Sequence, residues 1–308
     1  MTQGLHAVRK VDFSTDAALV SDAHALLQRA HEADGVEAFS EAFVTGIDRP
    51  KGHTHWALLI DGTLTALAAC APDRSVELVV DPPARRNGYG TTLARTVLEA
   101  RNDAGLWAHG DLPAAQALAA KLSLQPTREL LVMGVDGEEL QAIGALGSVA
   151  NALPSDYLEL SYPASIERWG RDAVEEAWLA VNNDAFSWHP EQGGWDMDAL
   201  HEAMNTEWFE PEGVRFLWAL GNGEPQLAGF HWTKRHSPEI GEVYVVGLSS
   251  DFRGQGLGDP LMRAGLEHLV AGGAKRVILY VEADNEPAVN RYKVMGFTVA
   301  ERHKVYST

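Results

Sequence analysis

Apolar residues in this chain occur in short runs separated by Gly, Pro, Asn and Asp, and the same order of runs occurs twice. In the first half, the run 76–81 predicts a buried strand, and the stretch 91–104 predicts the helix that follows it. In the second half, the run 242–248 and the stretch 258–271 predict the same pair. A hairpin that turns at Asp61-Gly62 precedes the first of these strands. The pattern predicts an α/β protein with mixed sheets, built as two similar domains.

Each predicted strand leads into a glycine-spaced loop with the pattern Arg-x-x-Gly-x-Gly. The two arginines, Arg85 and Arg253, lie 168 residues apart. A strand that leads through such a loop into a helix points several backbone N–H groups at one place, which suits phosphate. The loop has no Gly-Lys-Ser/Thr, and it lacks the position and spacing of the Gly-x-Gly-x-x-Gly dinucleotide pattern. The repeat therefore predicts two phosphate-binding modules.

The chain length agrees with this repeat. At 308 residues the chain is long enough for two domains of about 150 residues each. We expect a first domain at 1–140, a linker rich in Gly and Ala at 141–153, and a second domain at 154–308.

Composition narrows the class of protein. A hydrophobic content of 45% and a mean hydropathy of −0.17 are typical of soluble globular proteins. No run approaches the ~18 apolar residues of a membrane span, and the N-terminus has no apolar signal region. Cys70 is the only cysteine, which excludes an intrachain disulfide and suits a reducing compartment. The net charge of −18 argues against nucleic acid, because phosphate backbones need clustered Lys and Arg. We expect a cytoplasmic monomer without nucleic-acid or membrane partners.

The strand and Arg-x-x-Gly-x-Gly loop resemble motif A of the GNAT-superfamily N-acetyltransferases, and the segment 281–297 resembles their motif B. The resemblance implies two tandem acyl-CoA N-acyltransferase domains. It also implies that acetyl-CoA binds by strand addition to its pantetheine arm and by loop amides to its pyrophosphate. The residues carried over for acetyl-CoA in the first half are Leu78, Val79, Val80, Arg86, Asn87, Gly88, Tyr89, Gly90 and Thr91. Those in the second half are Val246, Gly247, Leu248, Arg253, Gly254, Gln255, Gly256, Leu257, Gly258, Asp259, Asn285, Glu286, Pro287, Ala288, Val289 and Asn290.

A narrower resemblance covers nearly the whole chain. The strings at 182–195, 229–234, 241–245 and 107–110 are similar to those of the mycothiol synthase family. The resemblance implies transfer of acetyl from acetyl-CoA to the cysteinyl amine of desacetylmycothiol (Cys-GlcN-Ins), giving mycothiol and CoA.

Catalysis is expected in the second half only. There the family match implies that Glu242 is the base that accepts the amine proton and that Tyr292 is the acid that protonates the departing thiolate. A shift of 168 residues puts Arg74 at the place of Glu242, and alignment of the helix ends puts Ala119 at the place of Tyr292. The first half is therefore expected to bind acetyl-CoA without catalysing transfer.

The match also implies the residues that contact the acceptor: Glu41, Glu191, Lys234, Glu242 and Tyr280. Because Glu41 comes from the first half, its involvement would place the acceptor between the domains. No metal is expected, since the pairs of histidines in the chain have neither cysteine partners nor a His-x-x-x-His spacing.

Two alternatives remain open. The acceptor could be another small amine or a peptide N-terminus, with the same fold and cosubstrate. The chain could also be a non-enzymatic sensor that binds acyl-CoA, although Glu242 and Tyr292 in the second half speak against this.

Overall fold

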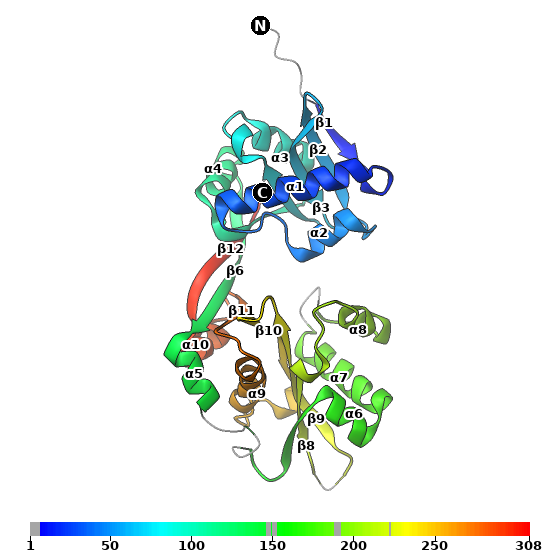
Figure 1. Ribbon diagram of the computed structural model, residues 1–308, viewed down its shortest axis with the longest axis vertical. Helices are drawn as coiled ribbons and strands as arrows, with labels where there is room; N and C mark the ends of the chain where they lie inside the picture. The colour runs from blue at the N-terminus through cyan, green and yellow to red at the C-terminus, as the bar shows by residue number, and fades with distance from the viewer. Residues whose placement is uncertain (1–6, 146–148, 150–152, 188–191, 222) are drawn as a thin grey trace. The chain divides into compact units, whose positions relative to one another are not determined.

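The computed structural model describes residues 7–145, 149, 153–187, 192–221 and 223–308. The chain divides into two compact units (Figure 1). Unit 1 consists of Met1–Leu131, Glu282–Asn285 and Glu301–Thr308, and unit 2 consists of Val132–Val281 and Glu286–Ala300. Each unit is thus built mainly from one half of the chain, and two short C-terminal segments belong to unit 1. The limits expected for the domains and the linker remain a prediction.

Unit 1 contains a mixed sheet with the strand order β1-β2-β3-β4-β5-β12. Neighbouring strands are antiparallel, except β4 and β5, which are parallel. The long strands β6 and β12 have residues in both units. The strands are β1 (Val8–Val11), β2 (Thr54–Ile60), β3 (Thr63–Cys70), β4 (Ser75–Val80), β5 (Gly105–Ala108), β6 (Gln125–Asp136) and β12 (Thr298–Ser307).

Helices cover both faces of the unit 1 sheet. Successive residues of β2 point to opposite faces. Accordingly, Ala57 packs in one apolar cluster with α1 and α2, whereas Trp56 and Leu58 pack in another with α3 and α4. The helices are α1 (Ala17–Asp34), α2 (Glu41–Asp48), α3 (Tyr89–Ala100) and α4 (Pro113–Leu122), with 3-10 turns η1 (Phe13–Thr15), η2 (Pro82–Ala84) and η3 (His109–Asp111).

Unit 2 repeats this plan with the strand order β6-β11-β10-β9-β8-β7. Strands β7 to β10 form antiparallel neighbours, and β10 and β11 are parallel. The strands of this unit are β7 (Tyr157–Ser161), β8 (Val214–Ala219), β9 (Gln226–Arg235), β10 (Ile240–Leu248) and β11 (Arg276–Glu282).

In unit 2, α6, α7 and α8 pack on one face of strands β8 and β9, and α9 packs on the other, as Figure 1 shows. Phe216 and Trp218 of β8 lie in the cluster with α6 and α7, whereas Leu217 between them lies in the cluster with α9. The helices are α5 (Gly137–Ala145), α6 (Tyr162–Trp169), α7 (Arg171–Ala185), α8 (Met197–Met204), α9 (Gly258–Ala271) and α10 (Glu286–Val294), with 3-10 turns η5 (Pro211–Gly213) and η6 (Ser250–Phe252).

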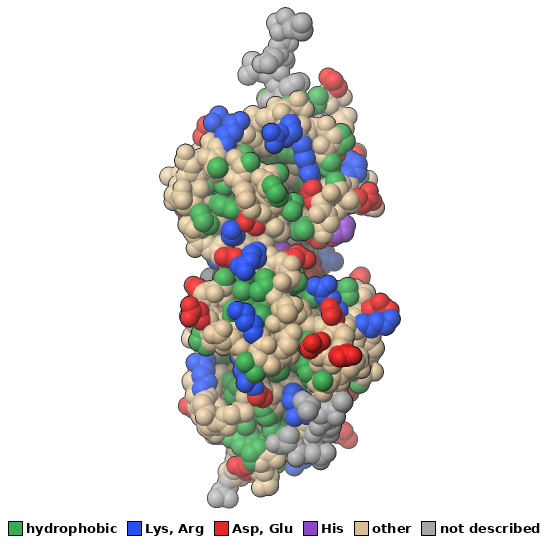
Figure 2. Space-filling model, turned by 90° about the vertical axis from the view of Figure 1, so that its left-hand side faces the viewer, with side chains coloured by type: hydrophobic (Ala, Val, Ile, Leu, Met, Phe, Trp, Pro, Cys, Tyr) green, Lys and Arg blue, Asp and Glu red, His purple; other side chains and the backbone are tan. Residues whose placement is uncertain are grey.

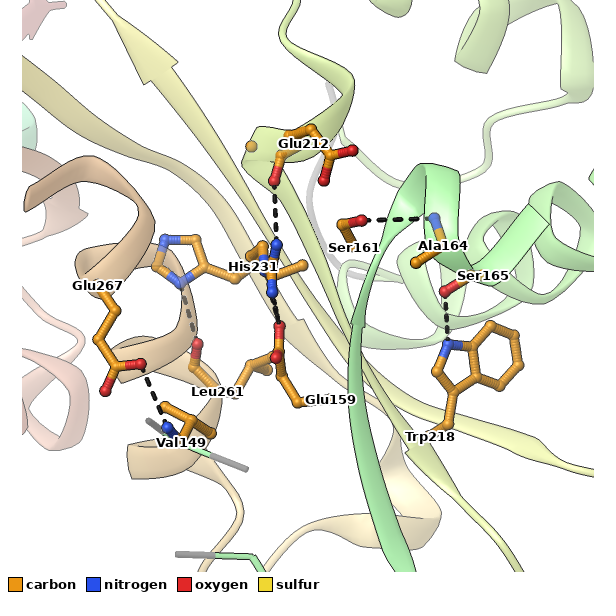
Figure 3. A network of polar contacts seen from close by, with 12 residues as sticks. Val149, Glu159, Ser161, Ala164, Ser165, Glu212, Trp218, His231, Leu261 and Glu267 are labelled. Atoms are coloured by element: carbon orange, nitrogen blue, oxygen red, sulfur yellow. Dashed lines mark hydrogen bonds and ion pairs between the residues drawn. The ribbon is translucent and has the colours of Figure 1, made fainter. Parts of the chain in front are cut away.

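Two buried side chains of unit 2 show hydrogen bonds between neighbouring elements (Figure 3). Trp218 Nε1 donates to Ser165 Oγ at 3.0 Å. His231, on β9, is fully buried, and its Nδ1 donates to the Leu261 carbonyl at 3.1 Å. Because burial disfavours the charged imidazolium, the pKa of His231 falls to about 4. His231 is therefore neutral in the folded protein near pH 7.

Two surface findings bear on possible partners. No helix among the described residues is both long and apolar enough to cross a membrane. On the face drawn in Figure 2, Lys and Arg side chains are interspersed with Asp and Glu.

The two parallel strand pairs separate along their length. In unit 1 the recorded pairing of β4 with β5 ends at Val76 and Leu106. In unit 2 the pairing of β10 with β11 ends at Val243 and Leu279, although both strands continue. Beyond these points each pair is open, which leaves main-chain groups of β4 and β10 available for an extended ligand.

Candidate active site

The glycine loop of unit 2 connects the open end of β10 to α9. Gly254 and Gly256 have φ values of 76° and 78°, in the left-handed region that glycine adopts without strain. Asp184 anchors the loop, because its carboxylate accepts hydrogen bonds from the Ser250 backbone N–H at 2.5 Å and from the Ser250 hydroxyl at 3.0 Å. The loop ends at Gly258, the first residue of α9, whose N-terminus favours an anion. The predicted residues 253–259 therefore form an anchored loop that ends at a helix N-terminus, an arrangement that suits an anion.

The predicted residues Val246, Gly247 and Leu248 form the open end of β10. On the β9 side they pair with His231, Phe230 and Gly229. On the β11 side the described pairing has already ended at Val243. The β11 side of this segment can therefore accept a ligand strand, and its N–H groups could polarise a thioester carbonyl.

Glu242 lies just before the point where β10 and β11 separate. Its side chain is buried, with 5% of the residue exposed. Its Oε2 lies 2.6 Å from Nε2 of His236, which belongs to the β9–β10 connection and has a side chain 36% exposed. Because a carboxylate only accepts, the imidazole donates this hydrogen bond. The pair links a buried carboxylate to a solvent-accessible imidazole.

Lys234 and Glu242 are directly opposite each other in the antiparallel β9–β10 pair, so both side chains lie on one face of the sheet. The Lys234 ammonium lies 4.5 Å from the Trp208 ring centroid and 5.6 Å from that of Tyr244. Tyr244 is the extra residue of a β-bulge between Val243 and Val245. The bulge breaks the alternation of β10 at this point, and Tyr244 lies on the face of Glu242 and Lys234, with its ring 4.8 Å from that of Trp208. Cation–π contacts thus hold the Lys234 ammonium on the Glu242 side of the sheet.

Tyr280 and Tyr292 are two further described residues of unit 2, predicted as an acceptor contact and as the acid. Tyr280 follows the last paired residue of β11 and is 46% exposed. Tyr292 lies on α10, with its ring 6.0 Å from that of Phe297. Burial raises the pKa of the Tyr292 phenol, so this group stays protonated and can donate a proton.

Helix α10 also joins the anion-binding loop. It begins at Glu286, and the predicted residues 285–290 form its start. The Arg291 guanidinium forms an ion pair with Asp259 in the first turn of α9. This pair ties the last turn of α10 to the first turn of α9.

Two predicted acceptor contacts are not among the described residues of unit 2. Glu41 is the exposed first residue of α2 and belongs to unit 1. Glu191 lies outside the described residues. The structure therefore groups Lys234 and Glu242 in direct register and places Tyr280 and Tyr292 in the same unit.

Unit 1 has the same loop beside a large cavity of about 470 Å³. Gly88 has a φ of 86° and precedes α3. The Arg85 guanidinium forms hydrogen bonds inside unit 1. It donates to both carboxylate oxygens of Asp34 at 2.6 and 2.7 Å and to the Val80 carbonyl at 3.1 Å. The next residue, Arg86, is exposed and lines the cavity. Of the predicted acetyl-CoA residues of unit 1, the cavity lining includes Leu78, Val79, Val80, Arg86, Gly88, Tyr89, Gly90 and Thr91.

The structure corrects one comparison between the halves. A constant shift of 168 residues aligned Arg74 with Glu242, but the strand registers align Ser75 with it. Val76 is the last residue of β4 paired to β5, as Val243 is the last residue of β10 paired to β11. The bulge at Tyr244 adds one residue to β10 and so changes the offset. Neither Arg74 nor Ser75 offers a carboxylate.

The alignment of Ala119 with Tyr292 agrees with the hydrogen bonds at the ends of α4 and α10. The Phe297 N–H donates to the Tyr292 carbonyl at 3.0 Å, and the Leu124 N–H donates to the Ala119 carbonyl at 3.0 Å. Because these C-terminal hydrogen bonds are the same, Ala119 takes the place of Tyr292.

Sequence reasoning missed two histidine contacts. The contact of His236 with Glu242 depends on the β9–β10 hairpin, which brings the two residues together. In unit 1, His109 follows β5 and its Nε2 lies 2.8 Å from Oε1 of Glu77, which is 2% exposed. The Trp107-Ala-His-Gly string contained His109, but nothing in it pointed to Glu77. The described residues contain no cluster of three or more His, Cys, Asp or Glu side chains able to hold a metal ion.

Comparison with known proteins agrees with the repeated plan. The sequence profile described as the acetyltransferase (GNAT) family matches residues 20–123 and 172–297. The chain is 50% identical over 282 residues to a mycothiol acetyltransferase of Corynebacterium efficiens, covering 91% of this chain and 90% of that protein. It is 45% identical over 301 residues to a protein of the same name from Corynebacterium glutamicum strain R, covering 97% of each.

Solved structures show the same fold. A tandem GNAT protein from the clavulanic acid biosynthesis pathway superimposes with a TM-score of 0.69 at 18% identity, covering 97% of this chain and 98% of that one. A GCN5-related N-acetyltransferase from Sphaerobacter thermophilus gives 0.66 at 20% identity, covering 97% and 94%. The tandem α/β prediction is therefore confirmed, and the chain belongs to the acetyltransferase (GNAT) family.

Proposed function

We propose that the chain transfers the acetyl group of acetyl-CoA to the cysteinyl amine of desacetylmycothiol, giving mycothiol and CoA. The observation that carries this is the buried Glu242 carboxylate at the opening between β10 and β11, on the strand that leads into the glycine loop. The named relatives at 45–50% identity over at least nine-tenths of the chain support the acceptor.

The reaction needs one base and one acid. An α-amine has a pKa of about 7.7–8.0, so much of it is an ammonium at pH 7. Glu242 takes one proton from the ammonium, directly or through one water, and frees the lone pair of nitrogen. The nitrogen attacks the thioester carbonyl, and the C–S bond then breaks. Tyr292 supplies a proton to the departing thiolate, so that CoA leaves as the thiol, and the second proton that the nitrogen loses as the amide forms returns the Tyr292 phenolate to the phenol. Since the amine attacks directly, no acyl group becomes attached to the protein.

His236 acts on this reaction as a positioning residue. Its hydrogen bond fixes one oxygen of Glu242 and leaves the other oxygen for the amine. Because the His236 side chain is 36% exposed, it also connects the buried carboxylate with solvent.

The remaining groups bind the two substrates. The loop at 253–258 and the first turn of α10 would hold the CoA phosphates, and the open side of β10 would pair with the pantetheine amides. Lys234 would donate to acceptor hydroxyls from its place beside Trp208 and Tyr244. Tyr280, Glu41 and Glu191 are proposed as further acceptor contacts.

Unit 1 is proposed to bind a CoA thioester without turnover. Its glycine loop is complete, but it has Ser75 and Ala119 where unit 2 has the base and the acid. We propose that the enzyme works as a cytoplasmic monomer without nucleic-acid partners. Light scattering during gel filtration would contradict the monomer if it gave twice the 33.5 kDa chain mass.

The test of the acceptor is CoA release with Cys-GlcN-Ins, set beside GlcN-Ins, cysteine, simple amines and peptides with free N-termini. GlcN-Ins is the matched control, because it keeps the sugar and inositol and lacks the cysteinyl amine. Selective turnover of Cys-GlcN-Ins supports the proposal. Turnover only with the other amines would reject this acceptor, and acetyl-CoA binding without any turnover would favour the sensor alternative.

A further inference from the structure

The cavity of unit 1 is lined by an alanine at a position where unit 2 has a tyrosine. Ala119 takes the place of Tyr292, as the matching hydrogen bonds at the ends of α4 and α10 show. In unit 2 the Tyr292 ring packs near Phe297. In unit 1 Ala119 and Leu124, which takes the place of Phe297, both line the cavity. The missing ring therefore leaves room in unit 1 beside the predicted CoA path.

This part of the cavity is apolar. Ala119 and Leu124 share it with Leu106 of β5, with Leu118 of α4 and with Tyr306 of β12. The same cavity reaches the glycine loop at 88–91, where the amide groups at the start of α3 favour an anion. It therefore combines an anion-binding end with an apolar space, which suits a CoA thioester with a hydrocarbon acyl chain.

The polar residue at the opening between β4 and β5 is not a free base. His109 donates through Nε2 to Glu77 at 2.8 Å. Its Nδ1 lies 3.1 Å from Nδ1 of His303, and the Gly110 N–H donates to that same His303 nitrogen at 3.2 Å. The two ring nitrogens of His109 therefore contact Glu77 and His303, so neither faces an acceptor molecule as a free base.

The carboxylates on the cavity lining are also paired. Asp34 accepts two hydrogen bonds from Arg85. Glu37 lies 3.2 Å from Nδ1 of His31. The carboxylates and the histidine of the described lining therefore already have partners.

We propose that unit 1 binds a CoA thioester whose acyl group is larger than acetyl and holds it without transferring the acyl group. This rests on the proposed binding of CoA by the unit 1 glycine loop. The acyl chain would lie against Ala119, Leu124 and Tyr306, in the space that Tyr292 closes in unit 2.

The prediction concerns relative affinities. Each buried methylene contributes about 0.8 kcal/mol, which is about four-fold in affinity. Hexanoyl-CoA has four methylenes more than acetyl-CoA, and burial of two of them would tighten binding about 15-fold. Competition binding of CoA, acetyl-CoA, butyryl-CoA and hexanoyl-CoA to the full chain measures this at each site. A site that prefers hexanoyl-CoA by ten-fold or more is expected; equal or weaker hexanoyl binding at both sites overturns the inference.

Variants assign that site to unit 1. Ala119→Tyr restores the residue of unit 2 and should remove the hexanoyl preference. Ala120→Tyr is the matched control, because Ala120 is the adjacent, exposed residue of α4 and does not line the cavity. If the melting temperature shows that Ala119→Tyr is unfolded, Ala119→Met replaces it, since flexible methionine fills the same space. A hexanoyl preference that survives the substitution at Ala119 overturns the inference.

The failure of the proposed function would look different. In that case acetyl-CoA would not bind to unit 2, or would bind there without any turnover. Failure of this inference alone leaves acetyl-CoA turnover intact and removes only the preference for the larger acyl group.

Discussion

Replacing Glu242 by Gln removes the proposed base with little change in shape. The side chain is buried beside His236, and the amide oxygen of Gln can still accept the 2.6 Å hydrogen bond. The substitution removes the negative charge and the oxygen that takes the proton. A positioned base contributes about 10²–10⁴-fold to the rate, or roughly 2.7–5.4 kcal/mol of activation free energy. Because only 5% of Glu242 is exposed, bulk water replaces the carboxylate poorly. We expect a fall in kcat near the middle of this range, about 10³-fold.

The assay is the steady-state release of CoA with Cys-GlcN-Ins, together with a separate measurement of acetyl-CoA binding. Affinity for acetyl-CoA should stay within about two-fold, because the phosphates are held by the loop at 253–258. Glu239→Gln is the matched control, since Glu239 lies on the same hairpin, is 61% exposed and pairs with Lys275 at 2.5 Å. A Glu242→Gln variant that folds and keeps kcat within about three-fold of the wild type would refute the role of Glu242 as base.

Four further outcomes are expected. Tyr292→Phe should lower kcat about 10- to 100-fold with little change in acetyl-CoA binding, because the acid for the thiolate is lost; an unchanged kcat would exclude that role. His236→Leu should lower kcat about ten-fold with little change in acetyl-CoA affinity, because Oε2 of Glu242 loses its hydrogen-bond donor, whereas His236→Gln should restore much of the rate because its side-chain amide can still donate; equal losses in both variants would contradict the positioning role. Lys234→Met keeps an unbranched side chain of similar length but loses the charge. The KM for Cys-GlcN-Ins should therefore rise at least ten-fold, while the KM for acetyl-CoA stays unchanged. Steady-state kinetics in which each substrate is varied in turn would check this. The pKa of His231 is about 4 in the folded protein and 6.5 in the unfolded chain. Its contribution of ~3 kcal/mol to the free energy of unfolding is therefore complete above pH 6.5 and is lost as pH falls towards 4. Denaturant unfolding across this range should show that His231→Met loses less stability with falling pH than the wild type does.

Much of the fold follows from local patterns in the sequence. The stretch 258–271 matches α9, and the strand expected at 242–248 lies within β10, because periodicity and glycine loops act over a few residues. Helix α8 (Met197–Met204) was missed, since an eight-residue helix gives only about two turns of pattern. The last residues of β12 join unit 1, a long-range pairing that no local pattern specifies.

The site was predictable only in part. Glycine spacing identified both loops, and the family resemblance identified Glu242 and Tyr292. The bulge at Tyr244 was not visible, because one inserted residue changes strand register without changing the apolar pattern. The same applies to His236, whose contact with Glu242 depends on how the hairpin turns.

The central claim is that unit 2 acetylates a cysteinyl amine by direct attack. The most direct test is the position of the acetyl group in the product made from Cys-GlcN-Ins, determined by mass spectrometry and NMR for the wild type and for Glu242→Gln. We predict acetyl on the cysteinyl nitrogen, a free thiol, and about 10³-fold less of this product per unit time with Glu242→Gln. Acetyl found on the sulfur, on the protein, or nowhere in the acceptor would contradict the account.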